Sequence, residues 1–243
     1  LWISNSQNKT VPKLNKNHQK RSVQELLILE NFYKRKNLEI IANKIYETKN
    51  LNSNDALLLS GFYFRLNDLQ KFNNIIQTKL SNQFDKEYII NNFSFNDNIF
   101  YKTPTLQTIL ASKIYNNSVL SNQQNENLSS YQKILLEMSL YLCPDLDIAK
   151  FSLAELYSLE RTNKLALRKL KYISTNSFFF LPSNLKRMSI IKSLDRQYDY
   201  QNLLLKSIKK WPNNKFLLHR IASYHKSREE YFESLKIYQK IIS

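Results

Sequence analysis

Residues 147–180, DIAKFSLAELYSLERTNKLALRKLKYISTNSFFF, carry the pattern that decides the fold. Apolar or small residues in the first half recur three and four residues apart, which places them on one face of a helix. Three in the second half repeat this spacing, and the polar link 160–163 between the halves is short. The stretch therefore predicts two antiparallel helices packed face to face. The six positions are Leu153, Ala154, Tyr157, Ala166, Leu170 and Ile173.

The same offsets recur 34 and then 68 residues further along the chain. Pro144 and Pro212, two such periods apart, each stop a helix because proline lacks an amide donor and clashes with the preceding turn. One helix pair cannot bury its apolar face alone, so we expect each pair to stack on a neighbour. The matching residues are Arg187, Met188, Ile191, Tyr200, Leu204 and Ser207, followed by Ile221, Ala222, His225, Ser234, Tyr238 and Ile241.

These residues resemble the tetratricopeptide repeat family, whose pattern is roughly W-x2-L-G-x2-Y, then A-x3-F-x2-A, then P. The chain has L-A-x2-Y with A-x3-L-x2-I in its first unit, and I-A-x2-H with S-x3-Y-x2-I in its third. Lys150, Asn184 and Leu218 stand where the family has Trp, while Arg187 and Tyr200 make the second unit the most divergent. The resemblance implies an all-α fold, a right-handed superhelical solenoid of antiparallel helix pairs, of the kind found in bacterial repeat proteins.

The pattern also predicts how the rest of the chain is organised. Ser22 and Glu25 form a capping-box pattern at the start of a helix that runs to about Arg35, and Thr105 caps a helix through Tyr115. Phe178, Phe179 and Phe180 replace a closing proline, and we expect them to be wedged between two units. The predicted segments are a basic lead-in (1–20), degenerate helical hairpins (21–80), an irregular break (81–104), a repeat with an expanded turn (105–146) and three regular units (147–180, 181–214 and 215–243).

Composition narrows the fold class further. The 243 residues are 42% hydrophobic and 13% aromatic, which is enough for a sizeable core. One Gly and five Pro argue against a β-rich or turn-rich architecture, which needs residues that accept positive φ. The single Cys143 excludes an internal disulfide framework and a Cys-based zinc site.

The net charge of +16 favours a second interpretation, a helical-repeat RNA-binding protein that uses a basic surface. Against it, the chain is rich in Lys, Asn, Ile, Tyr and Phe, the residues of A/T-rich codons, so genome composition explains much of the bias. Lys also outnumbers Arg, the residue favoured for bidentate phosphate recognition. Nucleic acid is therefore the alternative partner class, and another protein is the preferred one.

No motif for catalysis, a cofactor or a metal stands out. His18, His219 and His225 share no short spacing with one another or with Cys143 that suggests a metal site. His225 occupies the slot of the family's Tyr, which predicts a packed core histidine. No Gly-rich phosphate loop occurs. We expect a protein that is not an enzyme and that needs no cofactor.

The resemblance implies a binding groove lined by the first helix of each unit. A carboxylate clamp is not expected, since Phe151, Leu185 and His219 stand where that clamp has Lys. Apolar anchors with a basic rim instead favour a peptide or amphipathic helix with acidic flanks. This predicts a non-enzymatic protein-interaction scaffold. Its expected groove residues are Phe151, Glu155, Ser158, Leu185, Ser189, Lys192, His219, Ser223 and Lys226.

The remaining expectations concern membrane insertion, the compartment and the two ends of the sequence. No apolar run of about 20 residues occurs, so no transmembrane segment is expected. The chain begins at Leu1 rather than Met, which suggests a fragment or a processed form, and leaves the compartment open between bacterial cytoplasm and periplasm. The last predicted helix is apolar on more than one side. We expect further repeats beyond it or docking there, self-association included.

Overall fold

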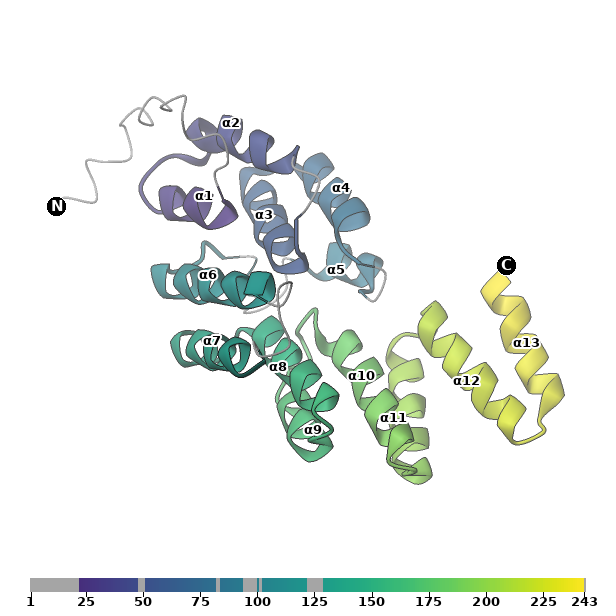
Figure 1. Cartoon of the computed structure of the whole chain (residues 1–243). Helices are drawn as coiled ribbons and strands as arrows, with labels where there is room; N and C mark the ends of the chain where they lie inside the picture. The colour runs from purple at the N-terminus through teal and green to yellow at the C-terminus, as the bar shows by residue number, and fades with distance from the viewer. Residues whose placement is uncertain are drawn as a thin grey trace.

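The computed structural model describes residues 22–47, 51–81, 84–93, 100, 102–121 and 129–242. All regular structure within these ranges is helical (Figure 1). The expectation of an all-α protein is confirmed. The helices are α1 (Val23–Glu30), α2 (Arg35–Tyr46), α3 (Ser53–Leu66), α4 (Leu69–Lys79), α5 (Lys86–Asn92), α6 (Leu106–Ser121), α7 (Ser129–Leu142), α8 (Asp147–Leu159), α9 (Asn163–Lys171), α10 (Phe180–Ser193), α11 (Gln197–Lys210), α12 (Lys215–Ser227) and α13 (Tyr231–Ile242).

Helices that follow one another in the chain pack side by side. Within pairs, α1 contacts α2, α3 contacts α4, and the pattern continues through α6/α7, α8/α9, α10/α11 and α12/α13. Between pairs, α7 contacts α8, α9 contacts α10 and α11 contacts α12. In Figure 1 the last three pairs follow an arc, with α8, α10 and α12 on the side nearer the N-terminal helices. We call this side the inner face. The arrangement fits a helical repeat array.

The turns inside the last three pairs recur with the 34-residue period. The second helices begin at Asn163, Gln197 and Tyr231, each 34 residues after the one before. Two residues earlier, Arg161, Asp195 and Glu229 take positive φ values of 59°, 58° and 63°. The predicted periodicity is therefore visible in the backbone itself.

Each of these turns closes its first helix with the same pair of hydrogen bonds. At the first turn the Arg161 amide donates to the Ser158 carbonyl at 3.1 Å, and the Thr162 amide donates to the Tyr157 carbonyl at 2.8 Å. This is the Schellman arrangement, which satisfies the last carbonyls of a helix and commonly uses Gly at the left-handed position. Here the left-handed residues are not glycines, so each of the three turns holds a side-chain-bearing residue in a strained backbone conformation.

Relieving that strain at the first turn is expected to stabilise the protein. A left-handed residue with a side chain costs about 1–2 kcal/mol, whereas Gly costs roughly 0.5–1 kcal/mol more chain entropy. Arg161→Gly should therefore raise the free energy of unfolding by about 0.5–1 kcal/mol. Urea denaturation measures it, with Arg168→Gly inside α9 as the control that should lose about 1 kcal/mol. Equal losses in both variants would contradict the turn assignment.

Burial follows the repeat positions. The small-residue slot of the first helices holds Ala154, Met188 and Ala222, all fully buried. The corresponding slot of the second helices, at Ala166, Tyr200 and Ser234, is also buried. Close helix crossing at these positions is what the spacing predicts.

The N-terminal helices differ from expectation in length. The Ser22 hydroxyl accepts a hydrogen bond from the Glu25 amide at 3.3 Å, as predicted, but α1 ends at Glu30 rather than near Arg35. The Asn31 side chain donates to the Leu27 carbonyl at 2.9 Å, which competes with continuation of the helix. The chain then turns, and Arg35 begins α2.

The helix predicted from Thr105 to Tyr115 is longer than expected. The Thr105 hydroxyl caps it as predicted, accepting from the Thr108 amide at 3.2 Å, but α6 continues to Ser121. The added turn is used in packing, because Asn116 and Ser118 are buried. The Asn116 amide donates to Asp55 at 2.9 Å, which ties α6 to α3.

Aromatic side chains join the predicted break to the C-terminal half. The described part of segment 81–104 contains α5 and the buried rings Phe84, Phe93 and Phe100. Phe178 stacks on Phe93 and Phe100 at centroid distances of 5.5 and 6.3 Å, and Phe179 meets Phe84 edge to face at 5.2 Å. Phe178 and Phe179 are buried, but they pack on N-terminal residues and not simply between two units as expected, and Phe180 is only half-buried. Within this segment, residues 82–83, 94–99 and 101 lie outside the described residues, as does the lead-in 1–20.

Candidate partner-binding groove

The expected groove residues belong to α8, α10 and α12, but they differ in exposure. Glu155 and Ser158 on α8 are half-buried, while Phe151 on α8 and Leu185 on α10 are buried. The remaining five are exposed polar or basic residues of α10 and α12. These five are Ser189, Lys192, His219, Ser223 and Lys226.

The two expected apolar anchors are used largely in the protein's own packing. The Phe151 ring lies 6.5 Å from that of Phe179 and keeps 7% of its surface exposed. Leu185 keeps 9%, and its carbonyl accepts a hydrogen bond from Arg220. An open apolar row along α8 and α10 is therefore not present, because Phe151 packs against Phe179 and Leu185 belongs to the core of the following helix pairs.

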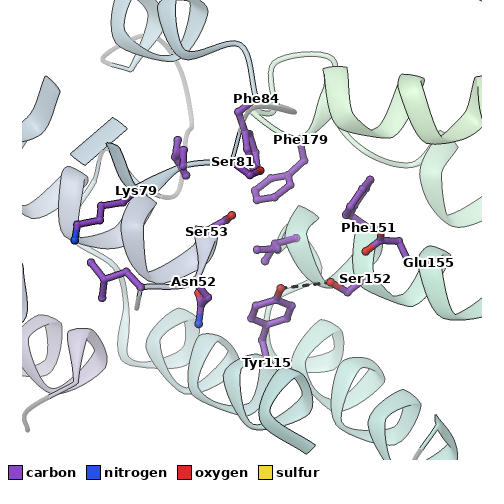
Figure 2. Close-up of a pocket in the computed structure, with 13 residues that line it drawn as sticks. Asn52, Ser53, Lys79, Ser81, Phe84, Tyr115, Phe151, Ser152, Glu155 and Phe179 are labelled. Atoms are coloured by element: carbon purple, nitrogen blue, oxygen red, sulfur yellow. Dashed lines mark hydrogen bonds between the residues drawn. The ribbon is translucent and has the colours of Figure 1, made fainter. Parts of the chain in front are cut away.

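In place of the expected apolar row, a pocket of about 430 Å³ lies beside Phe151 (Figure 2). Its walls come from the start of α3, the end of α4, the segment before α5, and helices α6 and α8, together with Phe179. In Figure 2 the rings of Phe84, Phe151 and Phe179 gather on one side, with Asn52 and Ser53 across from them. The lining residues are Leu51, Asn52, Ser53, Lys79, Leu80, Ser81, Phe84, Tyr115, Ile148, Phe151, Ser152, Glu155 and Phe179.

The polar groups of this pocket include one carboxyl and one phenol with raised pKa values. Burial raises the pKa of Glu155, and Lys186 opposes the rise only in part. Burial also raises the pKa of Tyr115 to about 12, so the phenol stays neutral at ordinary pH. Its oxygen lies 3.4 Å from the Ser152 hydroxyl. The pocket thus combines aromatic surface with neutral hydroxyls and one weakened acid, which suits recognition of a mostly apolar side chain.

The raised pKa of Glu155 predicts a pH-dependent stability effect. A carboxyl with a raised folded pKa holds its proton more tightly when folded, so its contribution to stability falls as pH rises above the ordinary value of 4.5. Glu155→Gln should therefore stabilise the protein at pH 7, by up to about 1 kcal/mol, and have little effect at pH 4. Denaturant titrations at both pH values measure this, with the exposed Glu229→Gln as control. A loss of stability at pH 7 would rule out the burial penalty.

The histidine expected in the core lies instead at the edge of the last helix pair. His225 is half-buried, and its Nδ1 lies 2.6 Å from a carboxylate oxygen of Glu230. This hydrogen bond is the main cause of the lowered pKa of Glu230, and Arg228 adds to it. The contact joins α12 to the start of α13. His219, an expected groove residue, meets the ring of Tyr238 edge to face at 5.6 Å.

The N-terminal wall of the pocket was not predicted from the sequence. Asn52, Ser53, Phe84 and Tyr115 precede Phe151 by between 36 and 99 residues. Their contribution depends on long-range packing, for which a local repeat pattern gives no signal. The one available hint was the aromatic richness of segment 81–104.

Comparison with known proteins does not assign the chain to a family. No family model matches it, and no curated protein matches it. Within the described ranges, none of the helices has both the length and the apolar character needed to cross a membrane. The same residues contain no group of three or more His, Cys, Asp or Glu side chains placed to hold a metal ion.

Proposed function

We propose that this protein is a non-enzymatic interaction scaffold, a tetratricopeptide-like array whose inner face binds a peptide or amphipathic helix of another protein. The observation that carries the proposal is the pocket at the N-terminal end of the inner face. It contains two of the expected groove residues, Phe151 and Glu155, beside the rings of Phe84 and Phe179. Its volume of about 430 Å³ is in the range of pockets that bind ligands.

The charge of the inner face supports the chemistry of the partner. Lys192 on α10 and Lys226 on α12 are exposed, and the repeat offsets predict that they line the same groove as Phe151 and Glu155. A partner segment would place an apolar side chain among the three Phe rings and acidic residues along the two lysines. Opposite charges along a binding face steer association and fix register. The partner class is therefore a segment with an apolar anchor and acidic flanks.

A matched pair of charge reversals tests the proposal. The inner variant carries Lys192→Glu and Lys226→Glu, and the outer variant carries Lys171→Glu and Lys209→Glu at exposed positions of α9 and α11. Both change the net charge equally. Proteins captured from a native lysate after nuclease treatment are quantified for each variant.

The proposal expects the inner variant to lose captured protein at least about tenfold, and the outer variant to stay within about twofold of wild type. Equal loss in both variants would show non-specific charge attraction and contradict a groove. Loss of all captured material on nuclease treatment, with steep salt dependence, would favour the RNA-binding alternative instead.

A further inference from the structure

A second pocket, of about 400 Å³, lies between α10 and α11 in the middle helix pair. Four of its lining side chains are cationic and one is acidic, while Phe180, Ile191, Leu203 and Trp211 supply apolar surface. We call it the α10/α11 pocket. Its lining residues are Phe180, Asn184, Arg187, Ile191, Arg196, Asp199, Asn202, Leu203, Lys206, Ser207, Lys210 and Trp211.

This pocket contains two places where the middle unit departs from its own repeat. Arg187 stands where the neighbouring units have Leu153 and Ile221. Ser207 stands where they have Ile173 and Ile241. Both polar residues line the pocket. Two positions that are apolar in the flanking helix pairs are thus polar in this one.

The positive charge of the pocket is only partly compensated. Arg196 pairs with Asp199 at 2.7 Å, which accounts for the one acidic lining residue. Among the described residues, Arg187 has no carboxylate partner and donates to the Asn184 side chain at 3.1 Å. Lys210 donates to the Thr175 carbonyl at 2.8 Å. Arg187 is half-buried, and burial lowers its pKa; the pKa of Lys210, at a more exposed position, is lowered for the same reason.

Two hydrogen-bond donors in the same wall are buried and unsatisfied. The Trp211 indole Nε1 and the Ser207 hydroxyl have no hydrogen-bond partner in the described part of the chain. Trp211 is 4% exposed and Ser207 is 2% exposed. Buried donors without partners are uncommon, because each costs about 1–3 kcal/mol of desolvation. Their shared location suggests that a ligand rich in acceptors completes this wall.

We propose that the α10/α11 pocket binds a small phosphorylated molecule. A phosphate monoester offers two negative charges and several acceptor oxygens, which match Arg187, Lys206 and Lys210. The rings of Phe180 and Trp211 also line the pocket, beside these cations. The ammonium of Lys210 lies 4.8 and 5.0 Å from these two ring centres, so charge and aromatic surface adjoin. This proposal is independent of partner binding at the inner face.

The test uses Trp211 as an internal reporter. The chain has two tryptophans, so Trp2→Phe leaves Trp211 as the only one. Inorganic phosphate, phenyl phosphate and acetate are titrated at constant ionic strength while fluorescence is followed. Thermal unfolding of the unaltered chain is measured in the same solutions. The proposal expects saturable binding of phosphate, tighter binding of phenyl phosphate, and a rise in Tm with both.

Arg187→Leu separates binding from folding, because it restores the apolar residue type found at Leu153 and Ile221. This variant should fold with equal or higher stability and bind phosphate at least about tenfold more weakly. Lys206→Gln, at an exposed lining position, should weaken binding severalfold. Lys209→Gln is the control, since Lys209 is exposed on the same helix but does not line the pocket.

Three results would overturn the proposal. The first is the lack of any saturable response to phosphate or phenyl phosphate in the protein that retains Arg187. The second is unchanged phosphate affinity in folded Arg187→Leu. The third is equal affinity for acetate, or a response to a short RNA oligomer without a response to phenyl phosphate.

Discussion

Gly61→Ala is expected to destabilise the protein by about 3 kcal/mol, although alanine is the better helix former. A methyl group at this position of α3 would clash with the carbonyl oxygen of Phe100. That oxygen belongs to the backbone and cannot rotate away, so either α3 or the segment at Phe100 must move. Overpacking of this kind usually costs 1–3 kcal/mol. The Arg65 guanidinium, which donates to the same carbonyl at 2.8 Å, would be displaced as well.

Urea denaturation followed by far-UV circular dichroism measures this change. The matched control is Asn73→Ala at an exposed position of α4, where alanine should be neutral or slightly stabilising. Near-UV circular dichroism should also weaken in Gly61→Ala, because Phe100 stacks on Phe178. If Gly61→Ala were as stable as wild type, the close approach of Phe100 to α3 would be refuted.

Glu30→Leu is expected to cost about 3–5 kcal/mol, the loss associated with a buried ion left without its partner. The Glu30 side chain is fully buried, and both of its oxygens bind the Arg65 guanidinium, at 2.8 and 2.6 Å. Arg35 adds a third hydrogen bond at 2.7 Å. The Arg65 side chain is only 6% exposed, so removal of the carboxylate leaves a buried charge that solvent cannot reach.

A double variant distinguishes charge pairing from simple packing. Glu30→Leu combined with Arg65→Met should be more stable than Glu30→Leu alone, because no uncompensated charge remains. Glu233→Leu is the comparison, since Glu233 forms an exposed pair with Lys236 and should lose less than about 1 kcal/mol. A double variant less stable than the single would mean that the Arg65 contacts with the carbonyls of Phe100 and Lys102 dominate.

The parts of the fold that could be predicted are those determined by local periodicity. The six positions beginning at Leu153 repeat with a 34-residue step, and the turns at Arg161, Asp195 and Glu229 recur with that same step. None of these turns contains a glycine at the left-handed position, so their positive φ values could not be predicted from residue type. The capping residues Ser22 and Thr105 also signalled their helices through local chemistry alone.

The contacts that could not be predicted join residues far apart in the sequence. Glu30 and Arg65 are 35 residues apart, and the stacking of Phe93 on Phe178 spans 85 residues. Helical spacing says nothing about such pairs. The buried state of Phe151, an expected anchor, follows from this long-range aromatic packing and was missed for the same reason.

The helices that carry the expected groove residues were easier to predict than the exposure of those residues. The expected groove residues do lie on α8, α10 and α12, since the helical phase of each unit fixes which positions share a face. Their binding role stays a prediction. The polar departures at Arg187 and Ser207 were visible as a divergent second unit, but only the structure places them in one pocket.

Site-specific photo-crosslinking tests the central claim, binding of a partner protein at the inner face. A benzophenone amino acid is placed at Ser223, an expected groove residue of α12, and in a second protein at Lys209 on α11. After irradiation in a nuclease-treated native lysate, the account predicts a discrete protein adduct at Ser223 that is absent at Lys209. The Lys192→Glu and Lys226→Glu changes should remove that adduct. Identical adducts at both positions, or adducts only at Lys209, would contradict the account.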